Sequence, residues 1–274
     1  MPTKITVGEY LDEWLRSATR GKEAATSRNY ADALRPAKER LGARLLHKLS
    51  TADIEDLIDW MLTSGRKRGG KVGTALSPRT VQLTLSRLRS ALDSAVHRRL
   101  IEYNPAAPVK CPTQVKIDRE PWTAAEVRVF LGSLTGERLH AVMLLSLLGL
   151  RPAEVCGLRW SDVDLDAGTL RVEITRTLVA TDHGMEVIEK GPKSASGRRT
   201  LPLPPQATTA LRAFKVAQAA EKLRAGEVYQ DSGFVLVDVL GAPQRTDWLR
   251  RRTYGLMVAA GSARSGRTMH GTPA

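Results

Sequence analysis

The chain has 274 residues, of which 42% are hydrophobic, enough for a buried core and for one or two domains. It carries 42 Lys and Arg residues against 29 Asp and Glu residues, a formal net charge of +13. That excess favours nucleic acid as a partner over the alternative, a soluble basic protein whose charge only keeps it dispersed.

Several other classes are excluded by pattern. No apolar run is as long as a membrane span, and the first residues lack a signal-peptide pattern. The five histidines show no metal-ligand spacing, so no metal site is expected. Cys111 and Cys156 lie far apart without a CxxC motif, which is typical of reduced thiols. We therefore expect a cytoplasmic protein with no membrane partner.

The first hundred residues predict helices, because apolar side chains recur at helical spacing in three stretches. Their apolar faces comprise Val7, Tyr10, Leu11, Trp14 and Leu15; Ile54, Leu57, Ile58 and Met61; and Val81, Leu85, Leu88, Leu92, Val96 and Leu100. Ser50 with Asp53, and Ser77 with Pro78, are typical of helix starts.

A Gly-rich basic loop, "SGRKRGGKVGTALS", separates the second and third of these helices. Such charges usually form a solvated face, but together with the net charge of +13 they favour a surface that follows phosphates. The candidate DNA-binding residues are Arg66, Lys67, Arg68, Lys71, Arg79, Arg87, Arg98 and Arg99.

Four prolines between Pro105 and Pro121, without a hydrophobic period, predict an extended linker. We therefore predict a helical domain over residues 1–104, a linker over 105–121 and a second domain over 122–261. The remaining residues, 262–274, form a tail without a hydrophobic period.

The second domain is predicted to mix helices with a small antiparallel sheet. Thr123 and Glu126 fit a helix start, and the apolar segment "LLSLLGLRPAEVCGLRW" ends in Arg151 with Glu154 one turn later. Alternation in "TLRVEITRTLV" predicts a strand, and "HGMEVIEKGPKSASGRRTLPLP" predicts two more. A helix over 207–223, a short strand in "GFVLVDV" and a basic helix in "DWLRRRTYGLMVAAG" follow.

These features, in this order, resemble the tyrosine recombinase (phage integrase) family. "GLRPAEVCGLRW" is similar to its first arginine motif and "PKSASGRRTLPLP" to its lysine-bearing hairpin, while "LSPRTVQLTLSRLRSALDSAVHRRLIEYNPA" is similar to its core-binding domain. The resemblance spans residues 3 to about 261. It implies a mainly α fold with a small antiparallel sheet, in which a helical SAM-like core-binding domain precedes an incomplete α+β catalytic domain.

The resemblance also implies roles for three residues. Arg151 would hold the nonbridging oxygens of a DNA phosphate, Glu154 would support that arginine, and Lys193 would protonate the leaving 5′-oxygen. No cofactor is implied. Taken singly, Arg151 with Glu154 is equally typical of a surface ion pair, and Lys193 of a solvated turn.

The family's His-x-x-Arg block and its nucleophilic tyrosine have no match in the sequence, and Tyr254 fits a packing or DNA-facing role better. Regrouping the codons of "RTMHGT" can give a block similar to the missing one, which suggests a frameshift near Gly261. We therefore expect a truncated or frameshifted member that binds double-stranded DNA, does not cleave it and does not form the family's tetramer. The alternatives are a non-catalytic regulator that occupies a recombination site and, with less support, a basic module unrelated to DNA.

Overall fold

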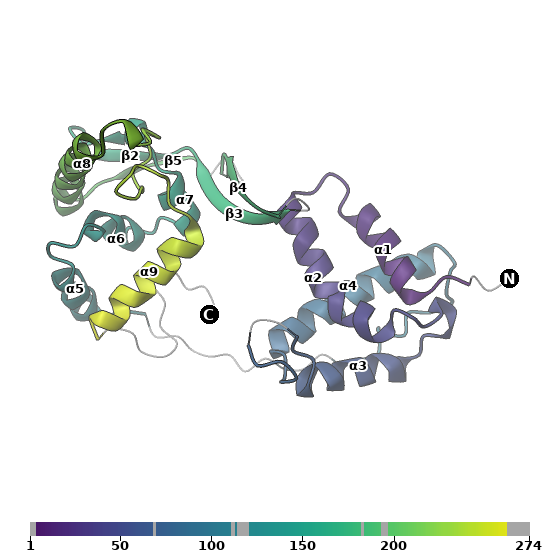
Figure 1. Ribbon diagram of the computed structural model, residues 1–274. Helices are drawn as coiled ribbons and strands as arrows, with labels where there is room; N and C mark the ends of the chain where they lie inside the picture. The colour runs from purple at the N-terminus through teal and green to yellow at the C-terminus, as the bar shows by residue number, and fades with distance from the viewer. Residues whose placement is uncertain are drawn as a thin grey trace. The chain divides into compact units, whose positions relative to one another are not determined.

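The structure is a computed structural model that describes residues 4–67, 70–110, 113, 121–181, 184–192 and 197–261 (Figure 1). The chain divides into two compact units, Met1–Ile117 with Ala180–Asp182, and Asp118–Val179 with His183–Ala274. Each unit has its own hydrophobic core. No helix in the described part of the chain is long and apolar enough to cross a membrane.

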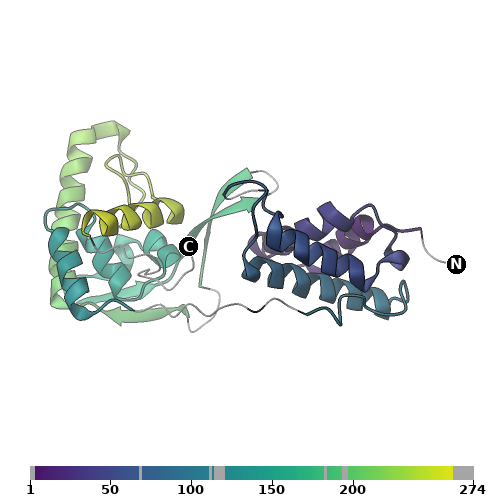
Figure 2. The same cartoon turned by 90° about the horizontal axis from the view of Figure 1, so that it is seen from below.

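Helices build the first unit (Figures 1 and 2). They are α1 (Val7–Ala18), α2 (Ala24–Leu41), the 3-10 turn η1 (Leu46–Lys48), α3 (Thr51–Thr63) and α4 (Pro78–His97). The three predicted apolar faces lie in α1, α3 and α4, except that Leu100 follows the end of α4. All of their residues but Val96 line the core of this unit or pack against it. The predicted starts of α3 and α4 are confirmed, since the hydroxyls of Ser50 and Ser77 accept hydrogen bonds from the first turn of each helix.

Helix α2 is the element that the sequence pattern did not single out. Only Leu34, Ala37 and Leu41 of its 18 residues are buried, and Pro36 removes one backbone hydrogen bond from its interior. Its apolar face packs against α1 and α4. Tertiary packing therefore stabilises a helix whose own pattern is weak.

The helical unit continues past residue 104, where the sequence predicted its end. The side chain of Asn104 donates to Asp93 Oδ1 at 2.7 Å and accepts from the backbone N–H of Ala106 at 2.9 Å. Ala106 and Val109 are buried in the core of this unit. The proline-rich segment therefore begins as part of the folded unit, because its apolar residues pack into the core of that unit.

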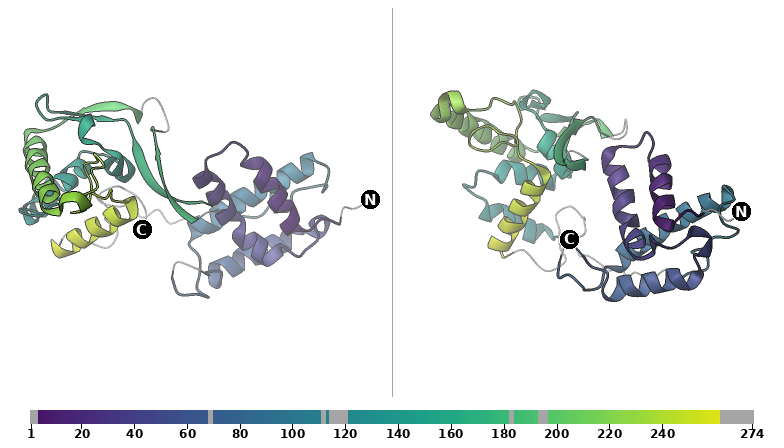
Figure 3. Two further views of the ribbon diagram at one scale, coloured as in Figure 1. Left: turned by 45° about the horizontal axis from the view of Figure 1, so that its top comes forward. Right: turned by 45° about the vertical axis from the view of Figure 1, so that its right-hand side comes forward.

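The second unit surrounds a small sheet with helices (Figures 1 and 3). Its elements are α5 (Ala124–Ser133), α6 (His140–Leu147), α7 (Pro152–Gly157), η2 (Trp160–Asp162), β1 (Val163–Asp164), β2 (Thr169–Val172), β3 (Thr175–Thr181), β4 (Gly184–Lys190), β5 (Arg199–Pro202), α8 (Pro205–Ala225), η4 (Gly226–Val228) and α9 (Thr246–Ala259). The mainly helical class with a small antiparallel sheet is confirmed.

Two strand predictions were wrong in detail. The chain leaves the sheet after Val172, so β2 and β3 are separate: β1, β2 and β5 form one antiparallel sheet, and β3 pairs with β4 in another (Figure 3). A Cβ added to Gly157 would lie 2.4 Å from the carbonyl oxygen of Ile174, so α7 packs directly on the backbone at this break. Residues 233–239 form two isolated bridges instead of the predicted strand.

Candidate functional site

The carboxylate of Glu154 lies at the centre of a cluster of two arginines. The side chain of Glu154 is 2% exposed and accepts four hydrogen bonds. Arg151 donates two of them, from its backbone N–H to Oε2 at 2.8 Å and from Nη1 to Oε1 at 2.8 Å. Arg199 donates the other two, from Nη1 to Oε1 at 3.1 Å and from Nη2 to Oε2 at 2.9 Å. Every lone-pair direction of this buried carboxylate therefore meets a donor.

The local chain path explains why Arg151 points outward. Gly149 adopts φ +88°, a left-handed conformation that favours glycine, and it turns the chain after α6. Leu150 is fully buried, whereas the side chain of Arg151 is 74% exposed. The apolar segment thus anchors the backbone on both sides of an exposed guanidinium.

Arg199 reaches the same carboxylate from the first residue of β5, paired with Val172 of β2. In the segment "PKSASGRRTLPLP", the resemblance pointed only to Lys193 and not to Arg199. A signal was available: Arg199 shares a strand face with Leu201, which packs on the core of this unit. An arginine on the core-facing side of a strand needs a carboxylate partner.

Electrostatics in the cluster favour the charged forms. Burial by itself raises the pKa of the Glu154 carboxyl, but hydrogen bonds from Arg199 and Arg151 outweigh it and hold that pKa below its ordinary value. The hydrogen bond to Glu154 raises the pKa of Arg199. Two guanidiniums and one carboxylate leave one net positive charge at this site.

Two predicted site residues, Lys193 and Arg68, lie outside the described residues. The structure therefore brings Arg151 and Glu154 together and adds Arg199. The roles of Arg151, Glu154 and Lys193 stay predictions.

The predicted DNA-binding residues do not form a single cluster. Arg79 lies at the start of α4, near the basic loop, whereas Arg98 and Arg99 follow its last residue. The 20 residues of α4 separate these ends by about 30 Å. The residues near its first turn and those past its last turn are therefore two separate basic surfaces.

Several of these side chains also have partners within the protein. The Arg98 guanidinium pairs with Glu13 at 2.6 Å, and that of Arg87 stacks 4.0 Å from the ring centre of Tyr30. Arg66 donates to the carbonyl of Ala75, and Lys67 lies 3.9 Å from Glu39. Lys71, Arg79 and Arg99 are exposed.

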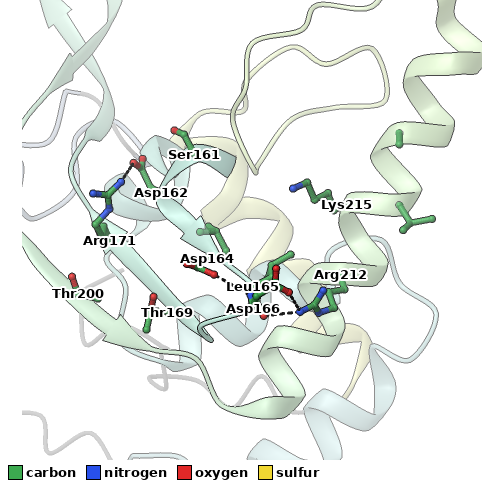
Figure 4. A pocket seen from close by; sticks show the side chains of 13 residues that line it. Ser161, Asp162, Asp164, Leu165, Asp166, Thr169, Arg171, Thr200, Arg212 and Lys215 are labelled. Atoms are coloured by element: carbon green, nitrogen blue, oxygen red, sulfur yellow. Dashed lines mark hydrogen bonds and ion pairs between the residues drawn. The ribbon is translucent and has the colours of Figure 1, made fainter.

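A groove of about 940 Å³ lies beside β2 and α8 (Figure 4), and its lining residues do not include Arg151, Glu154 or Arg199. Thr200 lines it, and because successive strand residues face opposite sides, the neighbouring Arg199 points away from it. Asp166 accepts from Arg212 at 2.6 Å across the groove. The described residues contain no group of three His, Cys, Asp or Glu side chains that could hold a metal ion.

Two tyrosines follow Arg151 in the sequence. Tyr254 lies on α9 and is 64% exposed. Tyr229 follows η4, and its ring lies against Gly241. Burial raises the pKa of the Tyr229 hydroxyl.

Curated proteins with similar sequences include a tyrosine recombinase and an integrase. The chain is 29% identical to a XerC-like tyrosine recombinase of Caldanaerobacter subterraneus over 60% of this chain and 46% of that protein. It is 27% identical to an integrase of Streptomyces ambofaciens over 91% of this chain and 62% of that protein. The chain thus spans less than two thirds of these relatives. No protein-family model matches it.

Solved structures share the fold over 97% of the chain. The Tn1549 transposon integrase, in complex with a circular intermediate DNA, has a TM-score of 0.74 at 18% identity, and 83% of that chain is covered. A lambda integrase dimer bound to a COC′ core site has a TM-score of 0.67 at 20% identity, with 67% covered. The arrangement of helices around a small sheet is therefore common to all three chains.

Proposed function

We propose that this chain, which belongs to the tyrosine recombinase (phage integrase) family, is a site-specific DNA recombinase of mobile-element type that binds DNA. Its partner is double-stranded DNA, in keeping with the net charge of +13 and with the DNA-bound relatives of the same fold. The observation that carries the proposal is the exposed guanidinium of Arg151 held by a buried carboxylate.

That geometry suits a phosphodiester. A guanidinium is planar and permanently charged, so it can donate two parallel hydrogen bonds to nonbridging oxygens. Glu154 restrains Arg151 through its backbone N–H and through Nη1, which leaves other guanidinium N–H groups directed to solvent. Restraint before binding is what electrostatic stabilisation of a phosphoryl group requires.

For these 274 residues taken alone, we propose binding without strand cleavage. Their sequence has neither the family's His-x-x-Arg block nor a tyrosine in a matching motif. A covalent phosphotyrosine needs that nucleophile. Incubation with supercoiled DNA is expected to give no nicked or protein-linked product, and such a product would refute this part of the proposal.

The phosphate contact of Arg151 is tested by duplex binding at several salt concentrations. Arg151→Gln is expected to weaken binding about tenfold, close to 1.4 kcal/mol, and to lower the salt-dependence slope by about one. Arg224→Gln, which removes an exposed charge from α8, is the matched control. A non-catalytic regulator without this contact would bind equally well after either change.

The two ends of α4 are compared in the same assay. We propose that the phosphate contacts of the first unit come from the end with Lys71 and Arg79. Both of these side chains are exposed, whereas at the other end Arg99 is exposed but Arg98 is engaged with Glu13. Arg79→Gln is expected to lower the salt slope by about one and Arg98→Gln to leave it unchanged. If Arg98→Gln lowers the salt slope and Arg79→Gln does not, the phosphate contacts lie at the other end of α4.

A further inference from the structure

The two arginines hold Glu154 in unequal ways. Arg199 donates to both carboxylate oxygens through its two terminal nitrogens, and its Nη1 also donates to the carbonyl of Gly197 at 3.2 Å. Its side chain is 28% exposed. The Arg151 guanidinium uses one nitrogen, Nη1, on the same carboxylate and stays 74% exposed. Both terminal nitrogens of Arg199 are therefore engaged by Glu154, whereas Glu154 engages one guanidinium nitrogen of Arg151.

We infer that Arg199 is a positioning residue that acts on DNA through Arg151: it compensates the charge of Glu154, so that the carboxylate holds Arg151 without cancelling its attraction for a phosphate. This inference rests on the proposed phosphate contact of Arg151. It assigns Arg199 no contact with DNA.

Charge counting gives the physical reason. Arg151 and Glu154 alone form a neutral pair, and a phosphate approaching that guanidinium would also meet a carboxylate within a few ångströms. A carboxylate that is 2% exposed is poorly screened by salt, so its repulsion would reach the phosphate. With Arg199 in place, the three groups carry one net positive charge, located at the exposed member.

The direct test removes the charge of Arg199 at similar side-chain length. Arg199→Met is expected to weaken binding to a mixed-sequence DNA duplex about tenfold and to lower the salt slope by about one. The matched control is Arg198→Met, on the preceding residue, whose guanidinium is 67% exposed and lies 3.9 Å from Glu173. That variant is expected to keep the slope of the unmodified chain. Equal losses from both substitutions would overturn the inference.

A rescue variant guards against simple loss of folding, since Arg199→Met leaves Glu154 with one partner fewer. Combining Arg199→Met with Glu154→Gln removes both compensating charges and leaves that of Arg151. Affinity and salt slope are expected to return toward those of the unmodified chain, with circular dichroism confirming the fold. A folded double variant that stays weak would contradict the charge mechanism.

The failures of the two proposals differ in this experiment. If Arg151→Gln has no effect on duplex binding, the proposed function of Arg151 is wrong. If Arg151→Gln weakens binding while Arg199→Met does not, only the role of Arg199 is wrong.

Discussion

Glu154 and Arg199 lie 45 residues apart in the sequence, yet hydrogen bonds of 3.1 and 2.9 Å join their side chains. The pair links α7 to the first residue of β5. It ties the arginine motif to the hairpin segment, so folding of the second unit and geometry of its candidate site depend on the same contact.

This contact predicts acid sensitivity of the second unit. Because the pKa of Glu154 is lowered by Arg199 and Arg151 despite its burial, its contribution is fully present above its ordinary value of 4.5 and is lost as pH falls through the lower, folded value. Thermal melts between neutral and acidic pH should show this loss. Glu154→Gln is expected to be less stable by about 2 kcal/mol at pH 7. Its Tm should also change less with pH in the acidic range, because the titrating carboxyl is absent. Parallel curves for the two proteins would contradict the prediction.

The second prediction concerns Gln218, a buried amide on α8. Its Oε1 accepts from the indole N–H of Trp160 at 2.8 Å, and its Nε2 donates to the carbonyl of Val235 at 2.6 Å. Gln218→Leu leaves the Trp160 indole N–H and the Val235 carbonyl without these hydrogen bonds. It is expected to lower the free energy of unfolding in urea by about 2 kcal/mol. Gln206→Leu, at an exposed position of the same helix, should change stability by less than about 0.5 kcal/mol. Equal effects of the two substitutions would show that the hydrogen bonds of the Gln218 side chain do not contribute to stability.

The third prediction concerns Tyr10, which joins α1 to α4. Its buried hydroxyl donates to the carbonyl of Ala91 at 2.7 Å. Tyr10→Phe should lower the stability of the first unit by about 1 kcal/mol, a fall in Tm of roughly 5 °C. Tyr103→Phe, at a side chain that is 61% exposed, is the control and should leave Tm unchanged.

The fourth prediction concerns the reactivity of Cys156. Burial raises the pKa of its thiol to about 12, so almost no thiolate forms near neutral pH. In a Cys111→Ser variant, where Cys156 is the remaining cysteine of the sequence, DTNB at pH 8 should react only after unfolding in guanidinium. Rapid reaction of the folded protein would show that the thiol is accessible.

Periodicity and capping residues determined much of the local structure. The apolar faces of α1, α3 and α4, and the starts at Ser50, Ser77 and Thr123, follow from interactions within three or four residues, which a sequence displays directly. The pairing of Arg151 with Glu154 belongs to the same class, since the two residues are one helical turn apart.

Tertiary contacts decided the rest. Helix α2 forms because its few apolar residues cover α1 and α4, and the alternating run after Thr169 breaks into two strands where α7 approaches the backbone of Ile174. Arg199 joins the site because the register of β2 with β5 sets it opposite Val172, close to Glu154. Short-range chemistry thus fixed the helices and one arginine, whereas the second arginine depends on a strand pairing that no local pattern encodes.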